Sequence, residues 1–101
     1  MKEILIRQYI NGDTAISYEA GIKCKEDIDN ALNKGQKIIM NFSGISYIIT
    51  AFLNPVIGDL ILERGEDVMK QIGIKNANPS IIKKIKRVKD GALIKREDVE
   101  E

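Results

Sequence analysis

The chain has 101 residues, of which 44% are hydrophobic and 31% are charged, a balance typical of one soluble globular domain. Its formal net charge of +1 indicates no general polyanion partner, and its single cysteine, Cys24, excludes an internal disulfide framework. Because the sequence has neither an uncharged apolar run long enough to span a membrane nor a signal-peptide pattern, we expect a cytoplasmic protein with no membrane partner.

Residues 2–10 alternate β-branched or aromatic side chains with polar ones, which predicts a β-strand. Charged residues such as Lys2 and Arg7 favour a position near a sheet edge. The triplet Asn11-Gly12-Asp13 then predicts a turn, because Asn and Gly adopt positive φ at low cost. Residues 14–17 either fold back as a hairpin or lead directly to a helix, and we favour a short loop, with or without a weak extended segment.

A helix is predicted from Tyr18, with Ser17 as its N-cap and Gly35 as its terminator. One face of this helix carries small and apolar side chains that we expect to lie on the sheet. These are Gly21, Cys24, Ile28, Ala31 and Leu32. We interpret Cys24 as a small buried hydrophobe, because the chain has no histidine to activate it and no second cysteine to resolve it.

Residues 36–42 contain the consecutive apolar side chains Ile38, Ile39 and Met40, which predict a strand covered on both faces. With the preceding helix as crossover, this strand takes a central place in a largely parallel sheet. Ser43-Gly44 ends the strand. Residues 45–49 form a second short apolar segment, to which we assign no strand partner.

The helix that follows, up to residue 62, is apolar almost all round and should be mostly buried. Its start has two solutions. If Thr50 is the N-cap, Pro55 falls inside the helix, where it cannot donate to the carbonyl of Ala51. Asn54 as N-cap with Pro55 at the first helical position is locally better, and 50–53 is then an irregular lead-in.

Residues 64–67 predict a polar connection around Gly65, and residues 68–74 predict a third strand. Asn78 then caps a last helix that Pro79 opens. Its predicted inward face consists of Ile81, Ile82, Ile85 and Val88. We expect a single domain over 1–92 and a charged C-terminal tail over 93–101.

The search for reactive groups indicates no enzyme. Without histidine, and with one cysteine, the chain offers no zinc site and no Ser-His or Cys-His pair. Its glycines form no phosphate-binding loop. We therefore expect neither a cofactor nor a metal. Carboxylates at helical spacing are interpreted as solvated helix faces: Asp27, Asp29, Asp59 and Glu63.

The last helix carries a possible basic surface that consists of Lys83, Lys84, Lys86 and Arg87. Such a cluster neutralises phosphates in nucleic-acid-binding proteins. Here no aromatic side chain stands among the charges to stack a base, and an amphipathic helix normally has a charged outer face. We favour the solvated face over nucleic-acid binding.

The run at residues 41–54, NFSGISYIITAFLN, resembles the STAS-like domain of unknown function, a relative of the bacterial anti-sigma-factor antagonist (STAS) fold. In that pattern a central strand ends in an Asp-Phe-Ser-Gly-Val type turn, and an apolar pair precedes a Ser/Thr-Ser-Phe helix start. The resemblance extends from about residue 17 to residue 88. It implies an α/β fold with a small mixed, mostly parallel sheet and about three main helices packed against it.

The resemblance also implies a docking surface around the loop and the N-terminus of the second main helix. Its residues are Ser43, Gly44, Thr50, Ala51 and Asn54. In the antagonists, a Ser or Thr there is phosphorylated by an ATPase-type kinase, which switches partner binding. The usual phosphoacceptor position falls on Ala51, with Thr50 just before it, while Ile49 replaces an acidic residue and Asn41 replaces Asp. For Thr50 itself we favour a helix cap over a phosphoacceptor.

The leading hypothesis is a non-enzymatic regulatory module that binds a partner protein, such as a histidine-kinase-like ATPase. One alternative is a domain that binds a small anionic ligand or nucleotide at the N-terminus of the same helix, where exposed N–H groups and the helix dipole favour an anion. Another is a nucleic-acid-associated subunit that uses the basic last helix.

Overall fold

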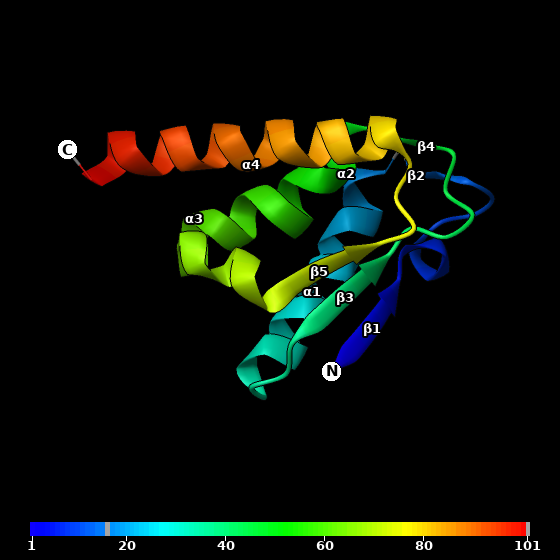
Figure 1. The fold of residues 1–101 in the computed structure, drawn as a ribbon, viewed down its shortest axis with the longest axis horizontal. Helices are drawn as coiled ribbons and strands as arrows, with labels where there is room; N and C mark the ends of the chain where they lie inside the picture. The colour runs from blue at the N-terminus through cyan, green and yellow to red at the C-terminus, as the bar shows by residue number, and fades with distance from the viewer. Residues whose placement is uncertain (16, 101) are drawn as a thin grey trace.

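The computed structural model describes residues 1–15 and 17–100, with the side chains of Ala15 and residues 96–100 left out. Three parallel strands form the main sheet in the order β1 (Lys2–Leu5), β3 (Ile38–Asn41) and β5 (Ile72–Lys75). Helix α1 lies behind this sheet, and α4 runs across the top of the molecule (Figure 1). The α/β architecture and the central position of β3 confirm the prediction.

One face of the sheet packs on the helices, through the buried side chains of Ile4, Ile38, Met40 and Ile72. The opposite face is only partly covered, because Ile39 is half-buried and Leu5 is exposed. The prediction that β3 is covered on both faces is therefore wrong for the second face. Even a strand with one covered face needs apolar side chains on that face.

Strand β1 is shorter than predicted, because a 3₁₀ turn, η1 (Ile6–Tyr9), replaces its second half. This turn sends Ile6 into the core, where it is fully buried, and brings the Tyr9 hydroxyl to donate a hydrogen bond to Asp27 of α1. The predicted turn follows, with Gly12 at φ 86°. Thr14–Ala15 then forms β2, which pairs in parallel with β4 (Tyr47–Ile48). The ladder in the 45–49 segment was not predicted.

Helix α1 (Tyr18–Asn33) has the predicted ends. The Ser17 side chain accepts a hydrogen bond from the N–H of Ala20 at 3.2 Å. At the other end Gly35, at φ 77°, donates to the carbonyl of Leu32 at 2.9 Å, while the next N–H reaches the carbonyl of Ala31 at 3.0 Å. This pair of bonds is a Schellman motif, which requires the positive φ that glycine supplies.

Residues 50–64 form one continuous helical segment with a π-helical centre: α2 (Thr50–Leu53), η2 (Asn54–Asp59) and α3 (Leu60–Arg64). The prediction of an irregular lead-in and an Asn54 cap is wrong. The helix begins at Thr50 with Ile49 at the N-cap position, so Thr50 is not the cap either. The wide π turn tolerates Pro55. Proline has no N–H to donate, and the π turn requires no α-helical hydrogen bond from this position.

The segment 66–71 is a 3₁₀ helix, η3 (Glu66–Gln71), where the sequence predicted the beginning of the third strand. Gly65, at φ 90°, ends α3 by donating to the carbonyl of Ile61 at 2.8 Å, and this turn directs Val68 into the core. Strand β5 therefore begins only at Ile72.

Helix α4 (Pro79–Glu100) starts as predicted, with the Asn78 side-chain oxygen accepting from the N–H of Ile81 at 2.9 Å. Its buried stripe consists of Ile81, Ile85, Val88 and Ala92. Ile82 was predicted to face inward but is 53% exposed, because only one narrow stripe of the helix touches the core. Within the described residues, α4 continues without a break past residue 92. The division into a domain and a tail at that residue stays a prediction.

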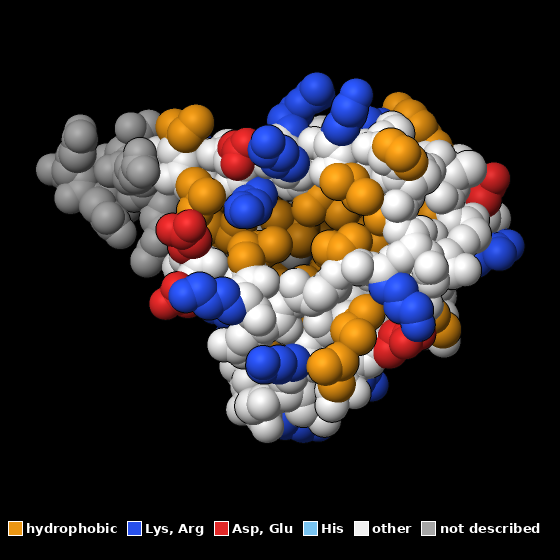
Figure 2. Space-filling view, in the orientation of Figure 1, with side chains coloured by type: hydrophobic (Ala, Val, Ile, Leu, Met, Phe, Trp, Pro, Cys, Tyr) orange, Lys and Arg blue, Asp and Glu red, His pale blue; other side chains and the backbone are white. Residues whose placement is uncertain are grey.

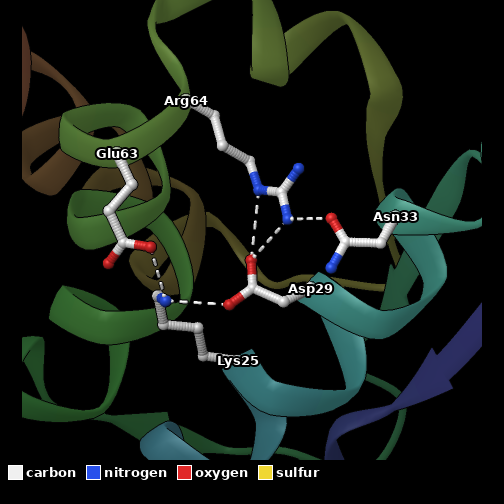
Figure 3. A network of polar contacts seen from close by, with 5 residues as sticks. All are labelled: Lys25, Asp29, Asn33, Glu63 and Arg64. Atoms are coloured by element: carbon white, nitrogen blue, oxygen red, sulfur yellow. Dashed lines mark hydrogen bonds and ion pairs between the residues drawn. The ribbon is translucent and has the colours of Figure 1, made fainter.

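A polar network fastens α1 to α3 (Figure 3). Lys25 pairs with both Asp29 and Glu63 at 2.9 Å, and Arg64 pairs with Asp29 at 3.0 Å. Arg64 also donates to the Asn33 side chain at 2.9 Å. Every charge has an opposite partner, so the network explains the Asp29 and Glu63 carboxylates as structural groups.

No helix in the part of the chain described is long and apolar enough to cross a membrane.

Substituting Gly21 by alanine should destabilise the fold by about 1–3 kcal/mol, because an added Cβ would lie 2.5 Å from the Phe52 carbonyl oxygen and 2.8 Å from Pro55. Urea unfolding measures the effect. Gly91→Ala is the matched control in α4, where a Cβ meets nothing within 4 Å. This change should raise the free energy of unfolding by about 0.5–1 kcal/mol. Equal effects of the two changes would show that α1 does not depend on this close approach.

Substituting Asp29 by asparagine should lower the free energy of unfolding by about 1 kcal/mol, because Lys25 and Arg64 both lose their shared carboxylate. Asp67→Asn is the control, since its pair with Lys70 spans 3.5 Å with both side chains almost fully exposed. That change should stay within about 0.3 kcal/mol. A smaller loss for Asp29→Asn than for Asp67→Asn in the same thermal scan would refute a stabilising role for the network.

Candidate functional site

The loop after β3 is organised by Asn41, a buried polar residue that is only 7% exposed. Its side-chain oxygen accepts from the N–H of Ser43 at 2.9 Å and from the Asn76 amide at 3.1 Å. Its own amide donates to Glu3 at 3.0 Å. These bonds join the end of β3 to Glu3 within β1 and to Asn76, which follows β5. Asn41 therefore holds the turn that contains Ser43, a role that depends on contacts from three separate segments.

Gly44, the next residue of this loop, has φ 78°, and a Cβ built on it would lie 2.6 Å from Nη1 of Arg7. The positive φ favours glycine here, whereas the Arg7 contact involves the end of a flexible side chain that can move aside. Ser43 and Gly44 are exposed. In the described part of the chain, neither lines the groove in which the other predicted site residues meet.

That groove, which we call the α2–α4 groove, has a volume of about 530 Å³. It is lined by Thr50, Asn54, Gly58, Asp59, Leu62, Arg87, Val88, Gly91, Ala92, Ile94 and Lys95. Thr50 and Asn54 were predicted from the start of the second main helix, and Arg87 from the basic last helix. The fold joins these two predicted surfaces into one concave site, while Ala51 is half-buried beside it without lining it.

The floor and the rim of the α2–α4 groove differ in chemistry. Val88 and Ala92 are buried at its base, where Val88 packs over Gly58 and a Cβ on that glycine would stand 3.4 Å from Cγ1 of Val88, an ordinary contact distance. The rim carries amide, carboxylate and cationic side chains together with Ile94, which is 61% exposed. A surface with an apolar base and a mixed polar rim suits contact with another protein.

The predicted basic surface does not act as one patch. The ammonium of Lys84 donates to the carbonyl of Ile48 at 2.7 Å and lies 4.1 Å from the centroid of the Tyr47 ring. Lys84 therefore holds β4 against α4. Lys83 and Lys86 are exposed, and helical rotation directs Lys86 and Arg87 to opposite flanks of α4.

The N-terminus of α2 offers few free donors to an anion. The N–H groups of Phe52 and Leu53 both bond back to the carbonyl of Ile49, at 3.1 Å and 3.4 Å. Binding of a small anion or nucleotide at this helix end stays a prediction without further structural support. Within the described residues, no group of three His, Cys, Asp or Glu side chains is placed to hold a metal ion.

Cys24 is fully buried, as predicted. Burial, with a smaller contribution from the charge of Asp27, raises the pKa of its thiol to about 12. The thiol is therefore protonated at neutral pH and shielded from solvent, and both conditions suppress nucleophilic chemistry.

Comparison with protein families gives one match, to a family described as a STAS-like domain of unknown function, over residues 20–81. The match covers more than half of the chain and runs from α1 to the first turn of α4. It includes the wall of the groove formed by α2 and η2, but not Arg87 or Ile94. Searches of curated proteins and of solved structures found no match.

Substituting Lys84 by methionine should cost about 1–2 kcal/mol of stability, because the Ile48 carbonyl loses its charged donor and Tyr47 loses the cation above its ring. Lys83→Met, which changes an exposed lysine of the same helix, should stay within about 0.5 kcal/mol. Urea unfolding of the two variants tests this. A Lys84 variant as stable as the Lys83 variant would show that Lys84 is only part of the solvated basic surface and does not stabilise the contact between β4 and α4.

Proposed function

The chain belongs to the family of STAS-like domains of unknown function, and from that premise we propose that it is a non-enzymatic regulatory module that binds a partner protein through the α2–α4 groove. The observation that carries this proposal is the convergence of Thr50 and Asn54 with Arg87 in one groove. A histidine-kinase-like ATPase is the partner class that the resemblance to the antagonists suggests.

The chemistry of the groove supports a protein partner. Exposed Ile94 gives an apolar contact at the rim, while Asn54 and Arg87 supply hydrogen-bond donors that set orientation. Asp59 and Lys95 place both signs of charge on the rim, so a partner of mixed charge is favoured over a polyanion.

The inert state of the reactive groups supports a non-enzymatic role. Cys24 is buried and protonated, the chain has no histidine, and the carboxylates of the α1–α3 network are paired with cations. The groove itself holds a hydroxyl, an amide and one carboxylate, and among the described residues no hydrogen bond joins the Thr50 hydroxyl to the Asp59 carboxylate. The Ser46 hydroxyl, which donates to the Asp13 carboxylate at 2.8 Å, lies outside the groove.

In our proposal, the α2–α4 groove is regulated through the hydroxyl group of Thr50. It is half-buried at the first helical position and lines the groove, while Ala51 offers no oxygen at the usual phosphoacceptor position. A phosphate on Thr50 would add about two negative charges at the groove and change partner affinity through charge and shape.

The test is quantitative capture from a lysate of the native host by the immobilised wild type, with bound proteins identified by mass spectrometry. Asn54→Arg and Ile94→Asp should each reduce recovery of the partner by about tenfold, because both introduce charge at the groove rim. Thr50→Glu should reduce it as well.

Asn30→Arg is the matched control, since Asn30 is an exposed helical asparagine on α1. It should leave recovery unchanged. Recovery of the same proteins by the wild type and by all groove variants would contradict the proposal.

A further inference from the structure

Strand β5 is an outer strand of the sheet, and its outward backbone edge has no strand partner among the described residues. In a parallel ladder, alternate residues direct their N–H and C=O groups to the same neighbour. The carbonyl of Lys75 accepts from the N–H of Phe42 at 2.9 Å, so Lys75 faces the β3 side. Ile74, one residue earlier, must direct both its N–H and its C=O away from β3. The Ile72 N–H, which also points outward, is taken by the carbonyl of Met69.

A hollow lies between this edge and α4, and we call it the β5-edge hollow. It has a volume of about 290 Å³ and is lined by Ile74, Asn76, Ala77, Ile82 and Ile85. Ile74 is 37% exposed and Ile82 is 53% exposed, although both are large aliphatic side chains. Figure 2 shows hydrophobic side chains gathered in a hollow on this face, below α4 and above β5.

Two lysines of α4 lie on the same flank of the helix as Ile82, which lines the β5-edge hollow. Ile82, Lys86 and Lys89 follow one another at helical spacing, so the two lysines extend the flank of α4 that begins with Ile82. In Figure 2, Lys and Arg side chains lie above and to the upper left of the apolar hollow, with an acidic side chain among them. The complementary ligand is therefore apolar in the hollow and acidic beside α4.

We propose that the β5 edge binds an extended segment of a partner protein as an added fourth strand. The segment pairs with the outward backbone groups of Ile74, inserts an apolar side chain into the β5-edge hollow, and directs acidic side chains to Lys86 and Lys89. Strand addition of this kind uses backbone hydrogen bonds for affinity and side-chain pockets for specificity. This surface lies on the flank of α4 opposite to Arg87 and Ile94.

The fold favours a single strand over a second copy of the chain. Two copies joined edge to edge through β5 by a two-fold axis would bring both helical layers to the same side. The α4 helices of both copies would then lie over the paired β5 strands. In each copy, its own α4 already forms one wall of the hollow at that place. The other sheet edge, β1, carries the charged side chains of Lys2 and Glu3 and has no equivalent apolar hollow among its described residues.

Selection of random peptides displayed on phage, followed by affinity measurement with the enriched synthetic peptide, tests the proposal on the full chain. Enriched peptides should alternate apolar and acidic residues. Ile82→Asp should weaken binding by about tenfold or more, while Ile94→Asp, the same change at a similarly exposed residue on the other flank, should leave it within about twofold. Equal affinity for the wild type and Ile82→Asp would overturn the proposal.

A backbone test separates strand addition from side-chain docking. Ile74→Pro removes the outward N–H, which a ladder edge tolerates, whereas Ile74→Val retains it with a side chain of similar size. The proline variant should lose about tenfold in affinity and the valine variant less than about threefold. In the wild type, the peptide should slow hydrogen exchange at the Ile74 amide, and unchanged exchange there would overturn strand addition.

The two proposals fail separately. Loss of partner capture by Ile94→Asp concerns the α2–α4 groove, whereas peptide binding depends on Ile82 and Ile74. Analytical ultracentrifugation provides the remaining check: a wild-type dimer that Ile82→Asp dissociates would identify a second copy as the occupant and overturn the proposal of a partner segment.

Discussion

The π-helical segment η2 is held between α1 and α4, and the close approach of α1 depends on one glycine. Gly21 lets α1 reach the Phe52 carbonyl and Pro55, while α4 packs against the other side, where Gly58 faces Val88. Backbone atoms cannot move aside as a flexible side chain can, so the contact at Gly21 fixes the distance between the helices. The sheet, the α1–α3 network and both surfaces of α4 are built outward from this packed centre.

The position of the α2–α4 groove follows from the same packing. Pro55 to Gly58 are buried, which leaves Asn54 and Asp59 at the two ends of η2 to reach the groove beside α4. Helix α4 buries only one stripe of side chains, so the flanks on both sides of this stripe are not buried. One flank meets η2 and carries Arg87 and Ile94, while the other meets the β5 edge and carries Ile82. A single narrow stripe of contact therefore leaves two separate hollows beside α4.

Local signals in the sequence predicted the helix ends at Ser17, Gly35 and Asn78, because cap chemistry depends only on neighbouring residues. They failed at Pro55, where local preference favours a new helix start but burial of Phe52 and Leu53 favours helix from Thr50. Contacts between distant segments left no local signal. The Lys84 bond to Ile48 and the meeting of Thr50 with Arg87 are both of this kind.

The pKa values of Tyr9, Cys24 and Lys25 are raised by burial or by hydrogen-bonded partners. Burial, followed by the hydrogen bond to Asp27, raises the pKa of Tyr9, and burial raises that of Cys24 to about 12. Burial alone would lower the pKa of Lys25, but its bonds to Asp29 and Glu63 outweigh this and raise it. A folded-state pKa above the unfolded value gives stability that is complete below the unfolded pKa and is lost as pH rises through the folded one. For Cys24 this loss lies between its ordinary pKa of 9.0 and about 12, far above neutrality. These groups are thus held in one protonation state at neutral pH.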